Sequence, residues 1–303
     1  MDGILNIRKE KGFTSHDVVA VVRRILHIRK VGHTGTLDPD AEGVLPICVG
    51  KATKLSDVIM DGTKSYRAMV RLGITTTTED AAGEIIEEKP VDFDTEKIQK
   101  VVLSMIGEQE QIPPMYSAIK VNGKKLYELA REGKEIARKA RKITIYHIAI
   151  RQFLPPNRLE IDVDCSKGTY IRTLCSDIGK ALGCGAHMEA LLRTKTGAFT
   201  LENAITLDQL QALADAGQTE QVFLSMDSAL SDYPKAYTDI RARKMLLNGG
   251  RIYEPYFQLE PKEQTIQLGD IITVYDDTQK LTGLYTLVQE ADKRCLKPWK
   301  MLI

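Results

Sequence analysis

The chain has 303 residues, 43% hydrophobic and 27% charged, the balance of a globular protein rather than a disordered one. No apolar run approaches the roughly 18 residues of a membrane span, and the N-terminus lacks the basic and apolar regions of a signal peptide. We therefore expect a cytoplasmic protein without a membrane partner. The net charge of +1 is close to neutral but unevenly spread.

Positive charge is concentrated in the middle of the chain. Residues 120–151 hold ten Lys or Arg against three Glu, whereas residues 201–232 hold six acidic residues and no Lys or Arg. A polyanion responds to the local charge rather than to the total. The middle segment is therefore the candidate phosphate-binding region.

The first third of the chain predicts a helix, a loop and two strands. Thr14 can cap an amphipathic helix of about three turns whose apolar positions run from Val18 to Leu26. Residues 31–50 are rich in Gly and Pro and predict a structured loop that leads into a strand at 44–49. Residues 65–74 alternate as a strand that places Tyr66 on its apolar face.

The next segment predicts an arm on a sheet. A helix is expected at 94–106 with Gly107 as its stop, then a basic arm at about 115–142 that contains the turn Asn122-Gly123. Two alternating stretches, 143–150 and 159–165, predict a hairpin. A helix that ends at Gly183 has Arg172 in its first turn.

The last third predicts a change of domain. An acidic helical segment at 207–230 is followed by Asp232-Tyr233-Pro234, and the remainder alternates as short strands. We expect a large domain at 1–232 and a small β-rich domain at 233–303. Strands mixed irregularly with helices indicate the α+β class.

Several common chemistries lack a motif here. The segment Gly50-Lys51-Ala52-Thr53 has neither the glycine spacing nor the Ser or Thr after Lys that a phosphate-binding loop requires. The five cysteines form no CxxC pair and there is no GxSxG elbow, so a disulfide framework, a zinc ribbon and acyl transfer are disfavoured.

Asp38 stands out because of its surroundings. It lies between Leu37 and Pro39 in a loop with Gly32 and Gly35 before it. Pro39 fixes its own backbone and pushes Asp38 toward an extended conformation, and the glycines allow sharp turns. Such a loop can hold one carboxylate rigidly, either as a turn cap or as a reactive group.

The stretch GHTGTLDPDAEGVLP (32–46), followed by GKATK (50–54), resembles the catalytic motif of the TruB family of tRNA pseudouridine synthases. Further stretches resemble motifs of that family in the same order: KSYRA (64–68), IPPMYSA (112–118), NGKKLY (122–127), CSKGTYIR (165–172) and LLRT (191–194). Two features depart from the family: Lys9 is followed by Glu10 where Pro is common, and residues 233–303 match its small PUA-like domain only loosely.

The resemblance implies a role for each site residue. Asp38 would be the essential carboxylate, Arg172 the cation that opposes the effect of burial on its pKa, and Tyr66 a stacking platform for a flipped base. Leu191 would form an apolar wall, and His33 would support the gap that the flipped nucleotide leaves. The other expected substrate-binding residues are Lys9, Gly32, Thr34, Lys124, Lys125, Arg141 and Lys142.

The resemblance also implies a fold and an activity. The fold would be a mixed, largely antiparallel pseudouridine-synthase sheet flanked by helices, with a PUA-like domain after it. The activity would be isomerisation of the T-loop uridine (position 55) of tRNA, without cofactor or metal, by a monomer that binds the T-arm stem-loop and needs no protein partner. Asp38 could attack the sugar, attack the base or remove a proton. A non-enzymatic RNA-binding protein, a hydrolase and a guide-RNA-dependent enzyme are the competing hypotheses.

Overall fold

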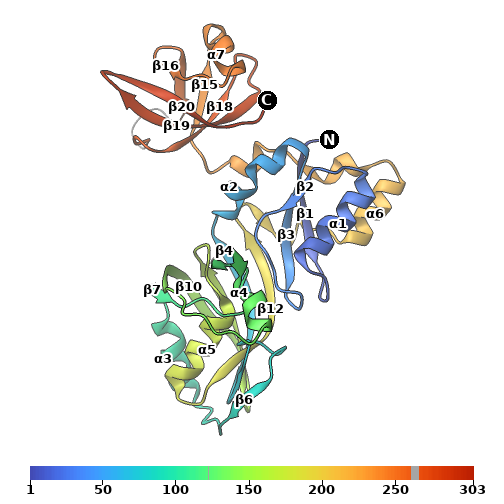
Figure 1. Cartoon of the computed structure of the whole chain (residues 1–303), viewed down its shortest axis with the longest axis vertical. Helices are drawn as coiled ribbons and strands as arrows, with labels where there is room; N and C mark the ends of the chain where they lie inside the picture. Colours follow the sequence, from blue (N-terminus) through green and yellow to red (C-terminus); the bar gives the residue numbers. More distant parts are fainter. Residues whose placement is uncertain (122, 261–265) are drawn as a thin grey trace.

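The computed structural model describes residues 1–121, 123–260 and 266–303, and it has an α+β fold built on two large sheets, with two further two-stranded sheets (Figure 1). Asn122 of the predicted turn lies outside the described residues. The elements up to residue 230 are β1 (Gly3–Lys9), α1 (Ser15–Leu26), β2 (Val31–His33), β3 (Glu42–Val49), the 3-10 helix η1 (Gly50–Leu55), α2 (Ser56–Met60), β4 (Lys64–Leu72), β5 (Ile74–Thr76), β6 (Ile85–Glu88), α3 (Thr95–Ser104), β7 (Gly107–Gln111), β8 (Lys120–Val121), β9 (Lys124–Lys125), α4 (Leu126–Arg131), β10 (Arg141–Leu154), β11 (Arg158–Cys165), α5 (Ile171–Leu182), β12 (Ala186–Thr196), β13 (Phe199–Thr200), α6 (Leu207–Asp215), η2 (Thr219–Val222), β14 (Phe223–Leu224) and η3 (Ser228–Leu230).

The large sheet has the strand order β14-β1-β3-β12-β4-β11-β10-β7. In addition, β2 pairs with β3 and β13 pairs with β12. Every pairing is antiparallel except that of β12 with β3. The predicted mixed, largely antiparallel sheet is confirmed. The parallel pairing brings Arg193 of β12 opposite Gly43 of β3, beside the loop that carries Asp38.

Both faces of the central strands are buried. Leu5 and Leu45 belong to a cluster that also contains residues of α1, α3 and α5. Ile4 and Val44, which point to the other face because side chains alternate along a strand, belong to a second cluster. The helix α1 is capped by Thr14, as predicted, and the capping box is closed by the Asp17 side chain.

Three predicted boundaries were wrong. Gly107 does not stop α3, which ends at Ser104, but begins β7. The basic arm ends earlier than expected, because residues 141–145 pair with β7 and so belong to β10. The acidic segment is not one helix: α6 ends at Asp215, and residues 223–224 form β14 on the edge of the sheet beside β1.

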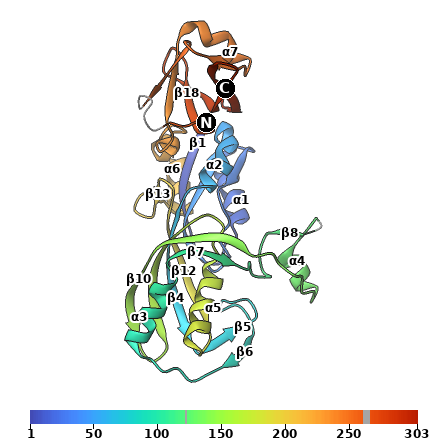
Figure 2. The same cartoon turned by 90° about the vertical axis from the view of Figure 1, so that its left-hand side faces the viewer.

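The arm projects from the body of the molecule. Residues of β8, β9 and α4 extend away from the large sheet to one side, as Figure 2 shows. Within the arm, the Tyr127 amide donates to the Ser117 carbonyl (3.1 Å) and the Leu126 amide to the Ile119 carbonyl (2.8 Å). These bonds fold the arm back on its own base.

A second sheet follows Pro234, with the strand order β16-β20-β19-β18-β15-β17. Its elements are β15 (Lys235–Thr238), η4 (Ile240–Ala242), α7 (Arg243–Leu247), β16 (Ile252–Tyr253), β17 (Phe257–Glu260), β18 (Ile271–Tyr275), β19 (Leu281–Glu290) and β20 (Lys293–Met301). The β-rich character predicted for this part of the chain is confirmed.

The two sheets share a hydrophobic cluster. Leu284 and Leu302 of the second sheet's region pack with Ile4, Val44 and the η1–α2 segment. Polar contacts border it: the Lys54 ammonium donates to the Met301 carbonyl at 2.6 Å, and Lys300 pairs with Asp57 at 2.7 Å. The second sheet is therefore packed on the first and not merely tethered to it.

The described residues contain neither a membrane-spanning helix nor a cluster of metal ligands. No helix in residues 1–121, 123–260 and 266–303 is long and apolar enough to cross a membrane. The same residues contain no group of three or more His, Cys, Asp or Glu arranged to hold a metal ion.

We predict that Leu284→Ala lowers the free energy of unfolding by about 2–5 kcal/mol, because it opens a cavity in the shared cluster. The control is Leu247→Ala, whose side chain is 66% exposed and whose loss should cost less than about 0.5 kcal/mol. Urea unfolding followed by Trp299 fluorescence and by far-UV circular dichroism should give coincident transitions. If Leu284→Ala unfolded in two separate transitions, and only the transition seen by Trp299 fluorescence moved to lower urea, the two sheets would not share a core.

Candidate active site

The loop that carries Asp38 is fixed along its length. We call residues 34–41 the Asp38 loop; it joins β2 to β3. Ser15 at the start of α1 binds Leu37 twice: its hydroxyl accepts from the Leu37 amide (2.9 Å) and donates to the Leu37 carbonyl (3.2 Å). The Pro39 carbonyl accepts from the Gly12 amide (2.9 Å). Asp38 is thus held from both sides.

Lys9 also binds the Asp38 loop. Its side chain is fully buried, and its ammonium donates to the carbonyls of Glu10 (3.0 Å), Phe13 (2.6 Å) and Pro39 (2.9 Å). Burial lowers the pKa of Lys9 to about 8, although the negative charges of Glu42 and Asp38 act to raise it. With all three donors bound to backbone, Lys9 positions the loop.

Arg172 is the centre of the site. Its Nε lies 3.1 Å from Oδ2 of Asp38 and its Nη2 lies 3.4 Å from Oδ1, so the guanidinium faces that carboxylate as a fork. Nη2 also donates to the Tyr116 carbonyl (2.8 Å), and Nη1 donates to the Thr78 carbonyl (3.2 Å) and approaches Asp80 (3.5 Å). One side chain therefore joins three segments that are distant in sequence.

The protonation of Asp38 reflects two opposing effects. Burial raises the pKa of the Asp38 carboxyl above its usual value, Arg172 lowers it, and the negative charge of Asp80 raises it again. The raised pKa shows that burial dominates, although the Asp38 side chain is 40% exposed and solvent tempers the shift. Arg172 was expected to oppose burial, and it does so without reversing it.

Tyr66 and Leu191 lie on the same face of two neighbouring strands. Tyr66 of β4 stands directly opposite Arg193 of β12, and Ala68 stands opposite Leu191. Directly opposite residues project to the same side of a sheet, so the ring, the leucine and the guanidinium share one face. Burial raises the pKa of the Tyr66 hydroxyl, and Arg193 acts in the opposite direction.

The residues around His33 are tightly packed. The His33 ring makes an edge-on contact with His16, with 5.1 Å between centroids, and its buried Nδ1 has no hydrogen-bond partner. Burial lowers the pKa of His33 to about 4, so the ring is neutral at pH 7. Gly32 lies within β2, and Thr34 is fully buried with its hydroxyl donating to the Pro46 carbonyl (3.3 Å).

The basic residues of the arm lie apart from this cluster. Lys124 is exposed and pairs with Glu132 at 3.1 Å, and Lys134 pairs with the same carboxylate at 2.8 Å. The Lys125 ammonium lies 5.3 Å from the centroid of the Tyr127 ring. Arg141 and Lys142 are exposed at the start of β10.

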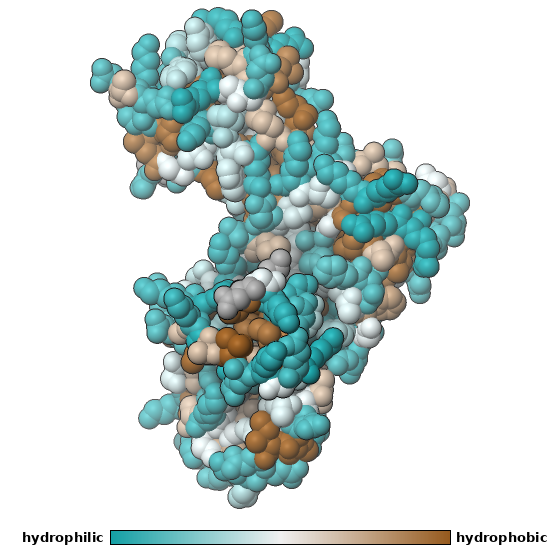
Figure 3. All heavy atoms as spheres, viewed as in Figure 1, coloured by the Kyte–Doolittle hydropathy of each residue, from teal (hydrophilic) through white to brown (hydrophobic). Residues whose placement is uncertain are grey.

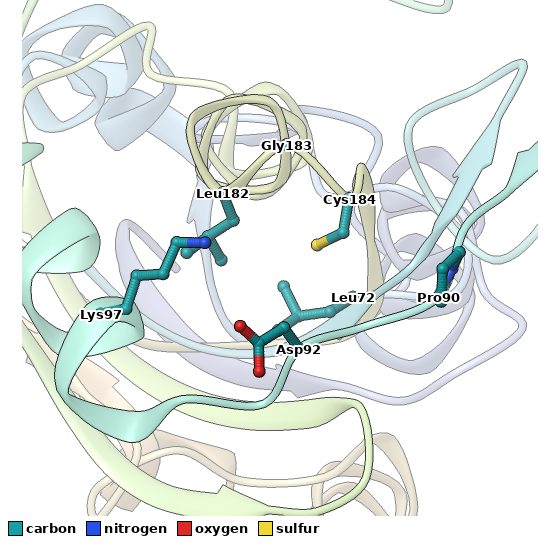
Figure 4. A pocket seen from close by; sticks show the side chains of 7 residues that line it. All are labelled: Leu72, Pro90, Asp92, Lys97, Leu182, Gly183 and Cys184. Atoms are coloured by element: carbon teal, nitrogen blue, oxygen red, sulfur yellow. The ribbon is translucent and has the colours of Figure 1, made fainter.

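A separate small cavity, of about 170 Å³, belongs to none of these groups. It lies at the far ends of β4 and α5, whereas Tyr66 and Arg172 are near the starts of those elements. Figure 4 shows the side chains that line it: Leu72, Pro90, Asp92, Lys97, Leu182, Gly183 and Cys184. This cavity takes no part in the Asp38 site.

Sequence reasoning missed two side chains of the site. Asp80 follows a polar run, TTTTE, that carries no motif, and only the fold brings it to Arg172. Arg193 lies in the LLRT stretch, but nothing in the sequence marks it as buried. It has no exposed surface in the structure.

Comparisons with known proteins agree with this geometry. Residues 23–171 match the model of the TruB family pseudouridylate synthase N-terminal domain, and residues 172–231 match that of the tRNA pseudouridylate synthase B C-terminal domain. Among curated proteins, the chain is 56% identical over 256 residues to tRNA pseudouridine synthase B of Alkaliphilus oremlandii (strain OhILAs), covering 84% of each chain. It is 44% identical to the protein of that name from Bacillus subtilis (strain 168), covering 100% of this chain and 98% of the relative.

Solved structures agree as well. A chain from the structure titled "Crystal Structure of a Cbf5-Nop10-Gar1 Complex" aligns with a TM-score of 0.79 and 28% identity, covering 99% of this chain and 85% of that one. A chain from "Structure of H/ACA RNP bound to a substrate RNA containing 2'-deoxyuridine" aligns with a TM-score of 0.77 and 25% identity, with coverages of 99% and 85%. The fold, the ordered motifs and the full-length relatives together establish that this chain belongs to the TruB family of pseudouridylate synthases.

Proposed function

We propose that this protein is a tRNA pseudouridine synthase that converts the T-loop uridine, position 55, to pseudouridine with Asp38 as its essential carboxylate. The observation that carries the proposal is the Asp38–Arg172 pair at 3.1 Å on a loop fixed by Ser15 and Lys9. Family membership and relatives named tRNA pseudouridine synthase B support it.

The proposed reaction is an isomerisation that uses the Asp38–Arg172 pair. It breaks the bond between N1 of uracil and C1′ of ribose, joins C5 to C1′ and moves one proton from C5 to N1, with no net oxidation. An ionised Asp38 beside the separating base and sugar supplies the reactive carboxylate, and the Tyr66 oxygen takes up the proton from C5. The Arg172 fork keeps that carboxylate oriented and favours its ionised form.

Extrusion of the target nucleotide is the second requirement. A uridine within a folded loop must leave its stack at a cost of a few kcal/mol, and stacking on an aromatic ring offsets about 1–3 kcal/mol. Tyr66 supplies the ring and Leu191 an apolar wall on the same face of the sheet. His33, neutral and packed against His16, supports the space that the nucleotide leaves.

Phosphate contacts supply the affinity for RNA. They come from the arm through Lys124 and Lys125 and from β10 through Arg141 and Lys142, which are charged side chains near the solvent. The molecule is hollowed on one side between its two ends, and that face is mostly hydrophilic (Figure 3). We assign residues 1–232 to catalysis and residues 233–303 to a PUA-like RNA-binding domain, in a cytoplasmic protein that acts as a monomer on the T-arm stem-loop.

The experiment that tests the activity is tritium release from a T-arm stem-loop labelled at C5 of the target uridine. Wild-type protein should release tritium without added metal or nucleotide, and Asp38→Asn should release none because a neutral amide cannot act as the reactive carboxylate. Asp40→Asn is the matched control: it is two positions away, exposed, and should keep wild-type release. Binding without release by wild type would leave only an RNA-binding role.

A second prediction concerns the arm. Lys124→Gln combined with Lys125→Gln should flatten the dependence of log K on log salt by about 0.7–0.9 for each phosphate that the variant no longer neutralises. Glu132→Gln should steepen it, because that carboxylate pairs with Lys124. Lys97→Gln with Lys100→Gln on α3 is the control, and an equal flattening in that variant would remove the arm from the interface.

A further inference from the structure

Arg193 is a buried cation that the proposed chemistry does not use. It is the largest fully buried side chain of the described residues, with no exposed surface. Its Nε donates to the Val44 carbonyl (2.7 Å) and its Nη2 to the Gly35 carbonyl (3.2 Å). Its Nη1 is buried without a hydrogen-bond partner. The bonded groups are carbonyls rather than carboxylates, so they do not neutralise the charge.

Burying an uncompensated charge lowers the free energy of unfolding, and a hydrophobic residue of similar volume in the same place would be less destabilising. The surroundings add to the cost: Lys64 and Lys9 are buried cations as well. The pKa of each lysine is lowered to about 8, chiefly by burial, and the charge of Arg193 contributes to the lowering. Arg193 is therefore one of three buried cations in this part of the sheet, and the negative charges of Glu42, Asp38 and Asp61 act on the two lysines in the opposite direction.

The backbone fixes where the Arg193 side chain begins. Arg193 pairs with Gly43 on one side and with Tyr66 on the other. Gly43 has a φ of +107°, and a Cβ built on it would lie 2.1 Å from the Arg193 carbonyl oxygen. A larger residue at position 43 would clash, so glycine lets β3 and β12 approach closely. Arg193 thus binds Gly35 of the Asp38 loop and stands opposite Tyr66 in the sheet.

Three groups influence the Tyr66 hydroxyl from the elements packed around it: Arg193 on β12, Cys165 on β11 and Asp38 on its loop. Burial raises the pKa of Tyr66, and Cys165 and Asp38 raise it further. Among these three groups Arg193 alone lowers it. The Nη1 of Arg193 is the guanidinium nitrogen that has no hydrogen-bond partner.

We propose that Arg193 is a positioning residue for Tyr66: its free Nη1 donates to the tyrosine oxygen when the base occupies the site and stabilises the phenolate there. The phenolate takes the proton from C5 once C5 is joined to C1′, the electrons of the C–H bond return to the ring, and N1 takes up a proton from solvent; the tyrosine later releases the C5 proton to solvent, so the net transfer is one proton from C5 to N1. This inference rests on the proposed function, in which Tyr66 contacts the base.

The test is the single-turnover rate of tritium release as a function of pH. Wild-type protein should gain rate as pH rises through the titration of Tyr66. Arg193→Gln removes the charge and the donor, so its rate should fall about 10- to 100-fold at neutral pH and its midpoint should move to higher pH. Its affinity for the stem-loop should stay within about twofold, because Arg193 does not reach the RNA.

Arg193→Lys and Tyr66→Phe complete the design. Arg193→Lys keeps the charge, so its midpoint should shift less, and it replaces Arg193→Gln if urea unfolding shows that Arg193→Gln does not fold. If the pH midpoint is unmoved in the folded variants, the inference is overturned. It is also overturned if Arg193→Gln lowers the rate by the same factor in the Tyr66→Phe protein as in the wild-type protein. A Tyr66→Phe variant with full rate would instead remove Tyr66 from the proposed mechanism while leaving Asp38 untouched.

Discussion

A buried guanidinium must find negative charge or hydrogen-bond acceptors, and Arg172, only 5% exposed, meets this constraint with partners from three segments. Asp38 and Asp80 supply the charge, and the carbonyls of Thr78 and Tyr116 supply further acceptors. The Asp38 loop, the β5–β6 connection and the base of the arm therefore meet at one side chain. The reactive carboxylate is oriented by the same interaction that holds these segments together.

The sheet makes this interaction possible by being buried on both faces. One face of β1 and β3 belongs to the hydrophobic cluster that residues of α1 and α6 also enter, and the other face packs with η1, α2 and the second sheet. The Asp38 loop leaves β2 and enters β3 within this frame, so its ends cannot move independently of the core. A half-exposed loop thereby acquires the rigidity that a positioned carboxylate requires.

Local features were predictable from sequence, and long-range ones were not. The Thr14 cap, the alternation that buries Tyr66 and the position of Arg172 at the start of its helix all depend on residues close in sequence. Asp80 joins the site only because the chain folds its segment back onto Arg172, 92 positions later. The extent of β10 depended on its pairing with β7, and the break after α6 on the pairing of β14 with β1. Partners distant along the chain decided these outcomes.

The most direct test of the central interaction is the acid limb of the single-turnover rate, for wild type and for Arg172→Lys. Asp38 acts when ionised, so the rate must fall as pH falls through its pKa. Burial places that pKa above the usual 3.8, and wild type should lose rate at a higher pH than a free aspartate would. Arg172→Lys loses the planar fork, so its midpoint should rise further and its maximal rate should drop while the fold persists. A midpoint at or below 3.8, or one that Arg172→Lys leaves unchanged with near-normal rate, would contradict the pairing.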